Sequence, residues 1–288
     1  MNEQDRKLFL PETMPFILLR LTMILVFLAV VYIFYDIVKK GFGVISFEFI
    51  TAPPRSGMTA GGIMPAILGT IYVTFITALA GMPVGFFAAI YLNEYAKRNL
   101  LTRIIRLSIR NLAGVPSMVY GMFGVALFVH SLSFGTSILS AGLTLGLLTL
   151  PVIITTAEEA LKSVPDAYRE GALALGASKW HSIRTNVIPS AFPGILTGMI
   201  LGLSRATGET APILFTGAAF FLPRLPTSID SQFMALPYHL FIMATQHHAV
   251  EKVRPLAYGT AVVLVTVVLA MNFAAIVLRA YYRRKLRG

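Results

Sequence analysis

The chain has 288 residues, of which 56% are hydrophobic and 13% are charged, and its mean hydropathy is +0.74. Because soluble domains carry about 25% charged residues, this composition excludes an ordinary soluble protein and indicates a membrane protein. The chain contains no cysteine, which excludes disulfide bonds and thiolate metal sites. Its formal net charge of +11 fits basic loops that face anionic lipid better than it fits nucleic-acid binding.

The apolar runs predict six membrane-spanning helices, since about 20 apolar residues cross the hydrocarbon core of a bilayer. In chain order these spans are Phe16–Val38, Pro65–Leu92, Leu112–Leu132, Ser137–Ala157, Ala191–Ala219 and Leu256–Ala280. The first run is too long for a signal peptide, so we interpret it as a retained helix. The predicted fold class is an all-α polytopic membrane protein with six transmembrane helices.

The distribution of basic residues predicts the orientation of the chain. With the N-terminus in the cytoplasm, 16 of the 24 lysines and arginines lie inside, 6 lie outside, and Arg20 and Arg205 lie within spans. Because cytoplasmic loops carry the excess of positive charge, both termini and the loop that contains Glu170 are predicted to be cytoplasmic. The segments Gly41–Met64 and Phe220–Arg254 are then external.

The loop between the fourth and fifth predicted spans has the pattern of two short helices. Ser163 is suited to cap the first helix, and Gly176 stands where a left-handed residue ends a helix. Ser178 is suited to cap the second helix, which Pro189 is predicted to end. A structured loop of this size is too small for a domain and is suited to docking a cytoplasmic partner.

One face of the first short helix carries Tyr168, Ala172 and Leu175, spaced i, i+4 and i+7. An apolar stripe on a short helix favours a contact in which the helix enters a groove on a partner. From the pattern alone, an ordinary surface loop that folds back on the bundle is an equally good interpretation.

Arg205 and Glu209 are the charged residues of the fifth predicted span. Their spacing places them on one helical face, beside small residues at every fourth position from Gly194 to Ala206, which favour close helix packing. Ionisable residues inside a membrane usually face a bundle interior or a water-filled path. One interpretation is a transient oxyanion site on a translocation path, where Glu209 holds Arg205. The other is a buried ion pair that only fixes helix register.

The residues Glu170-x-Ala172-x₃-Gly176-x₁₁-Ile188-Pro189 resemble the EAA loop of bacterial ABC importer permeases. In that family the loop forms coupling helices that seat in the ATPase subunit. The general pattern has Ala where this chain has Gly171, Ile where it has Asn186 and Leu where it has Ile188. Gly171 disfavours the helix by up to about 1 kcal/mol relative to Ala. The resemblance implies that ATPase coupling involves Glu170, Gly171, Ala172, Gly176, Ala177 and Ser178.

Three further segments narrow the resemblance: Tyr91-Leu-Asn-Glu-Tyr95, Leu112-Ala-Gly-Val-Pro-Ser117 and Ser204-Arg-Ala-Thr-Gly-Glu-Thr-Ala-Pro-Ile-Leu214. Together they resemble the permeases of the phosphate-specific transport (Pst) system. The Gly-Glu-Thr-Ala-Pro sequence and the short N-terminus resemble its PstA-type subunit. The resemblance extends from about Met64 to the C-terminus. It implies the type I ABC importer permease architecture in a bacterial cytoplasmic (inner) membrane.

The resemblance also implies partners and a function. A second Pst-type permease subunit would pair with this chain, an ABC ATPase dimer would dock at the cytoplasmic side, and a phosphate-binding protein would dock outside. The expected function is import of inorganic phosphate, with ATP and Mg used by the ATPase and no cofactor bound by this chain. The alternatives are an ABC permease for molybdate or sulfate, a passive anion channel or carrier, and a membrane sensor.

The sequence has no G-x₄-G-K-[ST] loop, nucleophile elbow or HExxH motif, which favours a non-catalytic subunit. His239 and the pair His247–His248 are interpreted as external-loop residues rather than metal ligands. The predicted domain organisation has three parts. These are 1–63 (tail, first span and external loop), 64–280 (permease domain with a coupling loop at about 158–190) and 281–288 (basic cytoplasmic tail).

Overall fold

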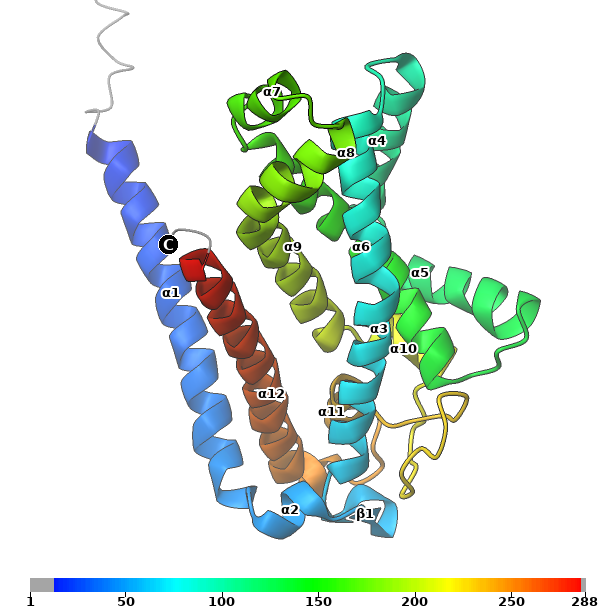
Figure 1. Cartoon of the computed structure of the whole chain (residues 1–288). Coiled ribbons are helices and arrows are strands. Elements are labelled where there is room, and N and C mark those ends of the chain that lie inside the picture. Colours follow the sequence, from blue (N-terminus) through cyan, green and yellow to red (C-terminus); the bar gives the residue numbers. More distant parts are fainter. Residues whose placement is uncertain (1–12, 286–288) are drawn as a thin grey trace, which may run out of the picture.

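The computed structural model describes residues 13–285, and its helices run between two ends of the molecule (Figure 1). Within those residues, five helices are long and apolar enough to cross a membrane. A pair of helices joined at a sharp bend gives a sixth span if the pair is counted as one. This result confirms the all-α polytopic fold class. The basic residues Arg6, Lys7 and Arg287, which the predicted orientation counted, lie outside the described residues.

The main helices are α1 (Thr13–Gly41), α2 (Phe47–Thr51), α3 (Met64–Ile90), α4 (Leu100–Leu112), α5 (Ser117–Gly124), α6 (Ile138–Lys162), α7 (Ala167–Ala174), α8 (Lys179–Ser182), α9 (Ile188–Gly208), α10 (Ala211–Thr216), α11 (Leu236–Thr245) and α12 (Val250–Lys285). Three π-helical segments extend them, at Tyr91–Tyr95, Val125–Ser131 and Ile183–Val187. Short 3₁₀ helices lie at Phe42–Val44 and Ser56–Met58. The strands β1 (Pro54–Arg55) and β2 (Ala60–Gly61) pair antiparallel.

The core of the bundle is formed by α3, α6 and α9, which pack through small residues. A Cβ atom at Gly194 would lie 2.6 Å from the Cβ of Ala160 on α6, and one at Gly198 would collide with Thr156. On α3, a Cβ atom at Gly85 would lie 2.6 Å from Ile153. These contacts confirm the predicted small-residue stripe, because only glycine permits such close helix approach.

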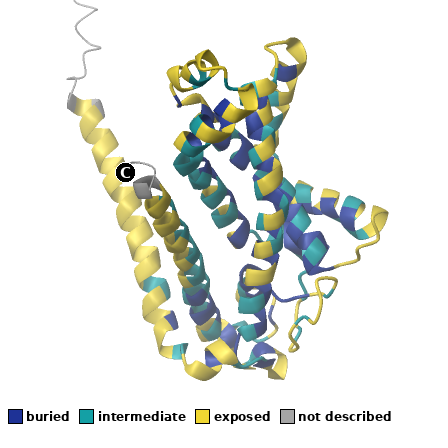
Figure 2. Ribbon diagram, in the orientation of Figure 1, coloured by how far each residue is buried: buried dark blue, intermediate teal, exposed yellow. Residues whose placement is uncertain are grey.

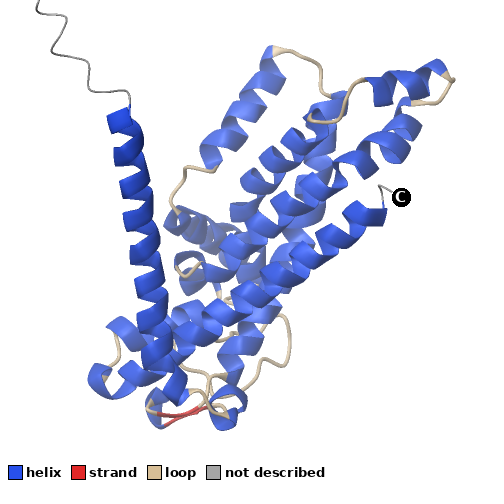
Figure 3. Cartoon of the chain, turned by 90° about the vertical axis from the view of Figure 1, so that its left-hand side faces the viewer, coloured by secondary structure: helices blue, strands red, loops and turns tan. Residues whose placement is uncertain are grey.

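The helix α1 lies at the periphery, beside α12 (Figure 1). Nearly all of its described side chains are exposed (Figure 2), as an apolar helix that faces lipid requires. The start of α1 and the end of α12 point toward the end of the molecule that carries α7 and α8. We call this end the α7 end. The small β1–β2 sheet lies at the opposite end (Figure 3).

The third predicted span differs most from expectation. Instead of one helix over Leu112–Leu132, the structure has α4 and α5 bent by 104°, with the break before Pro116. A residue that precedes proline is kept out of the helical region, so Val115 is a natural place for the chain to turn. The preceding α4 is amphipathic and carries arginines along one side.

The fifth and sixth predicted spans also have different limits. The helix α9 ends at Gly208, because Glu209 has an extended backbone (ψ 133°), and α10 begins at Ala211 with Pro212 in its first turn. Ala191–Ala219 is therefore a broken span rather than one helix. The helix α12 is longer than the predicted Leu256–Ala280, so the expected boundary at 280 falls inside a helix.

Candidate functional site

The first candidate site is the ion pair of Arg205 and Glu209 at the end of α9. The Nε atom of Arg205 lies 3.3 Å from Oε1 of Glu209, although the helix ends between them. The Arg205 side chain is 41% exposed and that of Glu209 is 18% exposed. The expected pairing is therefore present, but Glu209 joins it from an extended segment rather than from the same helical face.

The surroundings of Arg205 are shared among several helices. On its neighbour Ser204, the hydroxyl bonds to the side-chain amide oxygen of Asn272, which ties α9 to α12. On another side, Gly121 of α5 lies so close to α10 that a Cβ atom there would be 3.0 Å from the Cα of Pro212. The helices α5 and α12 therefore contact residues on either side of the break, while Gly208 itself is exposed.

A broken helix with an exposed guanidinium is suited to transient anion binding. Arginine presents several N–H donors in a plane and keeps its charge at any physiological pH. The contact with Glu209 uses the Nε donor, which leaves the terminal nitrogens of Arg205 free to meet an oxyanion. At 41% exposure, the guanidinium of Arg205 is accessible in this chain, whereas the carboxylate of Glu209 is mostly buried.

The second candidate site is the loop that contains α7 and α8. Gly176 has φ +82°, which confirms the left-handed residue predicted after the first short helix. The hydroxyl of Ser178 accepts a hydrogen bond from the backbone N–H of His181 (3.3 Å), which confirms its predicted cap. Gly171 lies inside α7, and Glu170 is exposed in its first turn. Ala172 and Ala177 are joined by a backbone hydrogen bond of 3.1 Å.

Two predictions about the loop boundaries are wrong. Ser163 does not cap α7: it ends α6, and its hydroxyl donates to the carbonyl of Ala160 (2.8 Å). Pro189 does not end the second helix, because the π-helical segment Ile183–Val187 leads directly into α9. Pro189 follows this π-helical segment, where the regular α-helical hydrogen-bond pattern is already interrupted, so the helix continues through it.

The loop presents apolar side chains to its surroundings. Leu175 is 91% exposed, and Tyr168, Leu173 and Trp180 are about half exposed. The predicted face of Tyr168, Ala172 and Leu175 therefore does not fold back on the bundle. Exposed apolar groups on a small, ordered loop favour contact with another protein.

The sequence analysis assigned no role to Glu94, which anchors this loop. The guanidinium of Arg169 donates to its carboxylate at 2.8 Å from Nη2 and at 3.2 and 3.3 Å from Nε. Glu94 is only 5% exposed in its side chain, and hydrogen bonding to it raises the pKa of Arg169. Lys179 bonds to the carbonyl of Glu94 and lies 4.9 Å from the ring of Tyr95. The sequence feature that could have identified Glu94 is that it is a single carboxylate at the end of an apolar span.

His239 lies in α11, and His247 and His248 lie between α11 and α12. Among residues 13–285, no three His, Asp or Glu side chains are grouped closely enough to hold a metal ion. His247 stacks on His248 with ring centroids 4.4 Å apart, and its Nε2 lies 2.6 Å from the carbonyl of Gly57. His239 is 2% exposed, so burial, with a smaller contribution from His247, lowers its pKa to about 4.

Comparison with known proteins gives relatives of similar length. The chain is 37% identical over 255 residues to the probable ABC transporter permease protein YqgI of Bacillus subtilis, covering 84% of this chain and 86% of that protein. It is 35% identical over 228 residues to the phosphate transport system permease protein PstA 1 of Mycobacterium tuberculosis, covering 79% and 73%. A probable PstA of Methanocaldococcus jannaschii is 32% identical over 252 residues, covering 86% of each chain.

Solved structures with the same fold are ABC transporter chains. A chain of a bacterial alginate importer aligns with a TM-score of 0.67 at 13% identity, covering 92% of this chain and 96% of that chain. A chain of the MetNI methionine transporter aligns with a TM-score of 0.60 at 17% identity, covering 75% and 94%. The fold is therefore that of a type I ABC importer permease.

A family model for inner membrane components of binding-protein-dependent transport systems matches residues 81–288. This match covers the loop that contains α7 and α8, which we call the α7 loop, and the segment around Arg205. The relatives agree with it along most of the chain. The chain thus belongs to the binding-protein-dependent transport system inner membrane component family, and it is a permease subunit of an ABC importer.

Proposed function

We propose that this permease carries inorganic phosphate into the cytoplasm and that Arg205 lies on the path. The observation that carries the proposal is the partly exposed guanidinium of Arg205 at the break between α9 and α10. The names of the relatives from M. tuberculosis and M. jannaschii, both phosphate transport permeases, support the choice of anion.

Glu209 has two effects on this site. It holds the Arg205 side chain in one position through the 3.3 Å contact. It also offsets part of the positive charge, so that phosphate binds weakly enough to leave again, as a conducting site requires. Arg205 and Glu209 act by binding and release, and this chain performs no chemical step.

The energy would come from partner chains. A second Pst-type permease would complete the path, an ABC ATPase dimer would hydrolyse ATP with Mg, and an extracytoplasmic phosphate-binding protein would deliver the anion. The ATPase would dock on the exposed side chains of the α7 loop. The residues Glu170, Gly171, Ala172, Gly176, Ala177 and Ser178 would pass its movement to the bundle.

This arrangement requires a defined orientation. In this proposal the α7 end, toward which the start of α1 and the end of α12 point, faces the cytoplasm and the β1–β2 sheet faces outward. Both termini would then be cytoplasmic. The excess of basic residues in the predicted cytoplasmic segments supports this orientation. Residues 64–280 then form the permease domain, with the coupling loop at about 158–190.

Uptake of labelled phosphate at low external phosphate tests the proposal. The host lacks this chain and other high-affinity phosphate uptake, and it is complemented with wild type, Arg205→Gln or Arg205→Lys at matched membrane levels. Arg205→Gln should lower uptake by about 10- to 100-fold, since a hydrogen bond to a charged group contributes about 1.5–3 kcal/mol. Arg205→Lys should restore part of it, because lysine keeps the charge without the planar donor set.

Arg254→Gln is the matched control, because Arg254 also pairs with a nearby glutamate, Glu251 (2.6 Å), but near the opposite end. It should leave uptake unchanged. Equal uptake by wild type and Arg205→Gln would remove Arg205 from the path. If the assembled wild-type complex fails to restore phosphate uptake, competition with molybdate and sulfate would identify another oxyanion. Uptake that persists without the ATPase would indicate a passive channel.

A further inference from the structure

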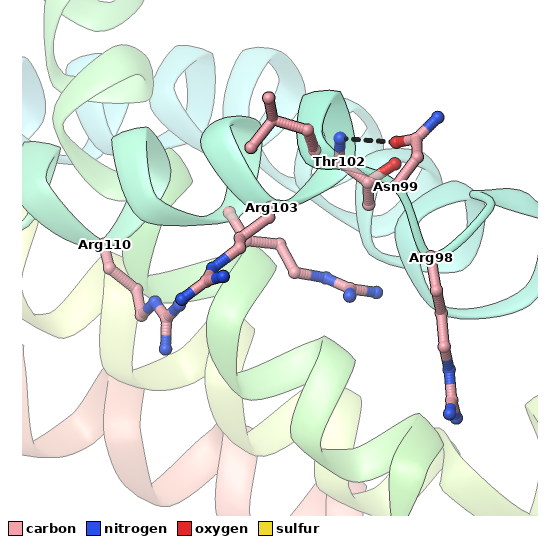
Figure 4. A pocket seen from close by; sticks show the side chains of 7 residues that line it. Arg98, Asn99, Thr102, Arg103 and Arg110 are labelled. Atoms are coloured by element: carbon pink, nitrogen blue, oxygen red, sulfur yellow. Dashed lines mark hydrogen bonds between the residues drawn. The ribbon is translucent and has the colours of Figure 1, made fainter.

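A second group of arginines surrounds a cavity at the α7 end, far from Arg205 in the sequence. The cavity has a volume of about 550 Å³ and extends along α4 from the segment before the helix to its last turn. Its lining residues are Arg98, Asn99, Leu100, Thr102, Arg103, Arg106 and Arg110. Figure 4 shows arginine side chains extending from α4 and from the segment before it around the same space.

Among residues 13–285, only one of the four arginines, Arg106, lies within ion-pair distance of a carboxylate, although Arg110 also lines a neighbouring cavity with Glu158 and Glu159. The Nε atom of Arg106 lies 2.8 Å from Oε1 of Glu158, without the alignment of a hydrogen bond, and its Nη2 donates to the carbonyl of Leu92 (2.6 Å). Within residues 13–285, no carboxylate forms an ion pair with the other three arginines of the lining. None of the lining residues is acidic.

The backbone of α4 adds to the positive potential. The helix has 13 residues and begins beside the cavity, so the positive end of its dipole points there. Asn99 caps it by accepting a hydrogen bond from the N–H of Thr102 (2.9 Å). On α4, Arg106 follows Arg103 by three residues and precedes Arg110 by four, and like charges at these spacings repel one another. A bound anion would relieve this repulsion.

The donor set indicates the chemistry of the anion. Guanidinium groups bind phosphate through paired N–H donors, more specifically than a lysine does. We propose that the arginines of this cavity bind a phosphate group, separately from Arg205. Two sources share this chemistry: inorganic phosphate that has been released on this side, and the headgroup of an anionic phospholipid. The first source rests on the proposed function; the second does not.

The flank of α4 makes the lipid source physically reasonable. Leu100, Leu101 and Ile104 are 71%, 64% and 51% exposed. An amphipathic helix with an apolar side and arginines on the other side places its charges at the level of lipid headgroups. The experiment must therefore separate the two sources.

The test uses the complete transporter in nanodiscs, without its binding protein and in an Arg205→Gln background, so that the proposed path contributes no anion contact. Equilibrium binding of ³²P-labelled inorganic phosphate is measured in neutral phosphatidylcholine discs. Retention of phosphatidylglycerol is measured by native mass spectrometry in mixed discs. The variant is Arg103→Gln with Arg110→Gln, which keeps the Arg106–Glu158 pair. Arg224→Gln with Arg254→Gln removes the same charge near the other end.

Loss of phosphate affinity by about tenfold or more in the α4 variant alone would support the inorganic phosphate source. Loss of phosphatidylglycerol retention in that variant alone would support the lipid source. Unchanged values in both measurements, or an equal loss in the control, would overturn the proposal. Phosphate uptake by the transporter with Arg205 intact is a separate readout. Its failure would remove the proposed function and leave the binding result standing.

Discussion

Arg169 and Glu94, 75 residues apart in the sequence, join the α7 loop to the end of α3 through hydrogen bonds to both carboxylate oxygens. The same guanidinium donates to the carbonyls of Leu161 and Val164, at the end of α6 (2.9 and 2.8 Å). One side chain therefore connects the loop with two helices of the core. A movement of α7 that is imposed by a docked ATPase would be passed to α3 and α6 through this contact.

We expect Glu94→Gln to uncouple ATP hydrolysis from transport. The substitution removes the negative charge beside Arg169, whose side chain is 19% exposed, and the loss of a charged hydrogen-bond partner costs about 1–3 kcal/mol. The number of phosphate ions transported per ATP hydrolysed, measured in the reconstituted complex, should fall. Asp166→Asn is the control, because Asp166 also pairs with Arg169 (3.2 Å) but is 84% exposed. A normal ratio in Glu94→Gln would contradict this role.

A pair of glycine substitutions tests how backbone preference at two positions sets the stability of the loop that contains α7 and α8. Gly176→Ala should loosen the loop, since a left-handed conformation costs a residue with a Cβ atom about 1–2 kcal/mol. Gly171→Ala adds the same methyl group inside α7 and should favour the helix by up to about 1 kcal/mol. A Cβ atom at either position meets nothing within 4 Å. The two effects therefore come from the backbone alone.

Hydrogen–deuterium exchange of residues 166–178 in the complete transporter measures these effects. Exchange should be faster in Gly176→Ala and slower in Gly171→Ala than in wild type. The opposite order, or no difference, would show that the loop conformation is set by the docked partner instead.

Hydropathy and residue spacing correctly predicted the structural features whose cause lies within a single short segment of the chain. Six spans, the small-residue stripe at Gly194 and Gly198, the left-handed Gly176 and the Ser178 cap all follow from local sequence. The Arg205–Glu209 contact was also predictable, because residues four positions apart are close to one another in a helix. The two side chains still meet although the helix ends before Glu209.

The features that sequence reasoning missed depend on tertiary contacts or on competing local preferences. The break after Gly208 could not be predicted from hydropathy, since an apolar run alone indicates one continuous helix. Pro189 resembled a helix end, yet the π-helical segment before it carries the helix onward. Glu94 and Arg169 lie in different segments, and nothing in either segment indicates that they meet.

Substitution of the exposed Leu175 tests whether the ATPase docks on the α7 loop. Leu175→Ser should lower the affinity of the ATPase subunits for the permease pair by about 10- to 100-fold, because burial of a leucine contributes about 1.5–3 kcal/mol. It should leave the fold intact, since the side chain is 91% exposed in this chain. Leu225→Ser is the control, an exposed leucine in the segment between α10 and α11. Binding of purified ATPase to nanodisc-embedded permease measures the change, and equal binding by both variants would place the docking surface elsewhere.

His239 predicts a dependence of stability on pH. Its pKa is about 4 in the folded protein against an ordinary value of 6.5, because burial disfavours the charged imidazole. Between these values the unfolded chain binds the proton and the folded chain does not. Stability is therefore full above about pH 6.5, falls as the pH drops toward about 4, and changes no further below that, with a total loss of about 3 kcal/mol. The unfolding temperature in detergent should fall between about pH 7 and pH 5 in wild type and in His248→Gln, which alters an exposed neighbour. In His239→Gln the fall should be smaller, because no imidazole is left at that position to take up the proton; a fall as large as in wild type would assign the pH dependence to other groups.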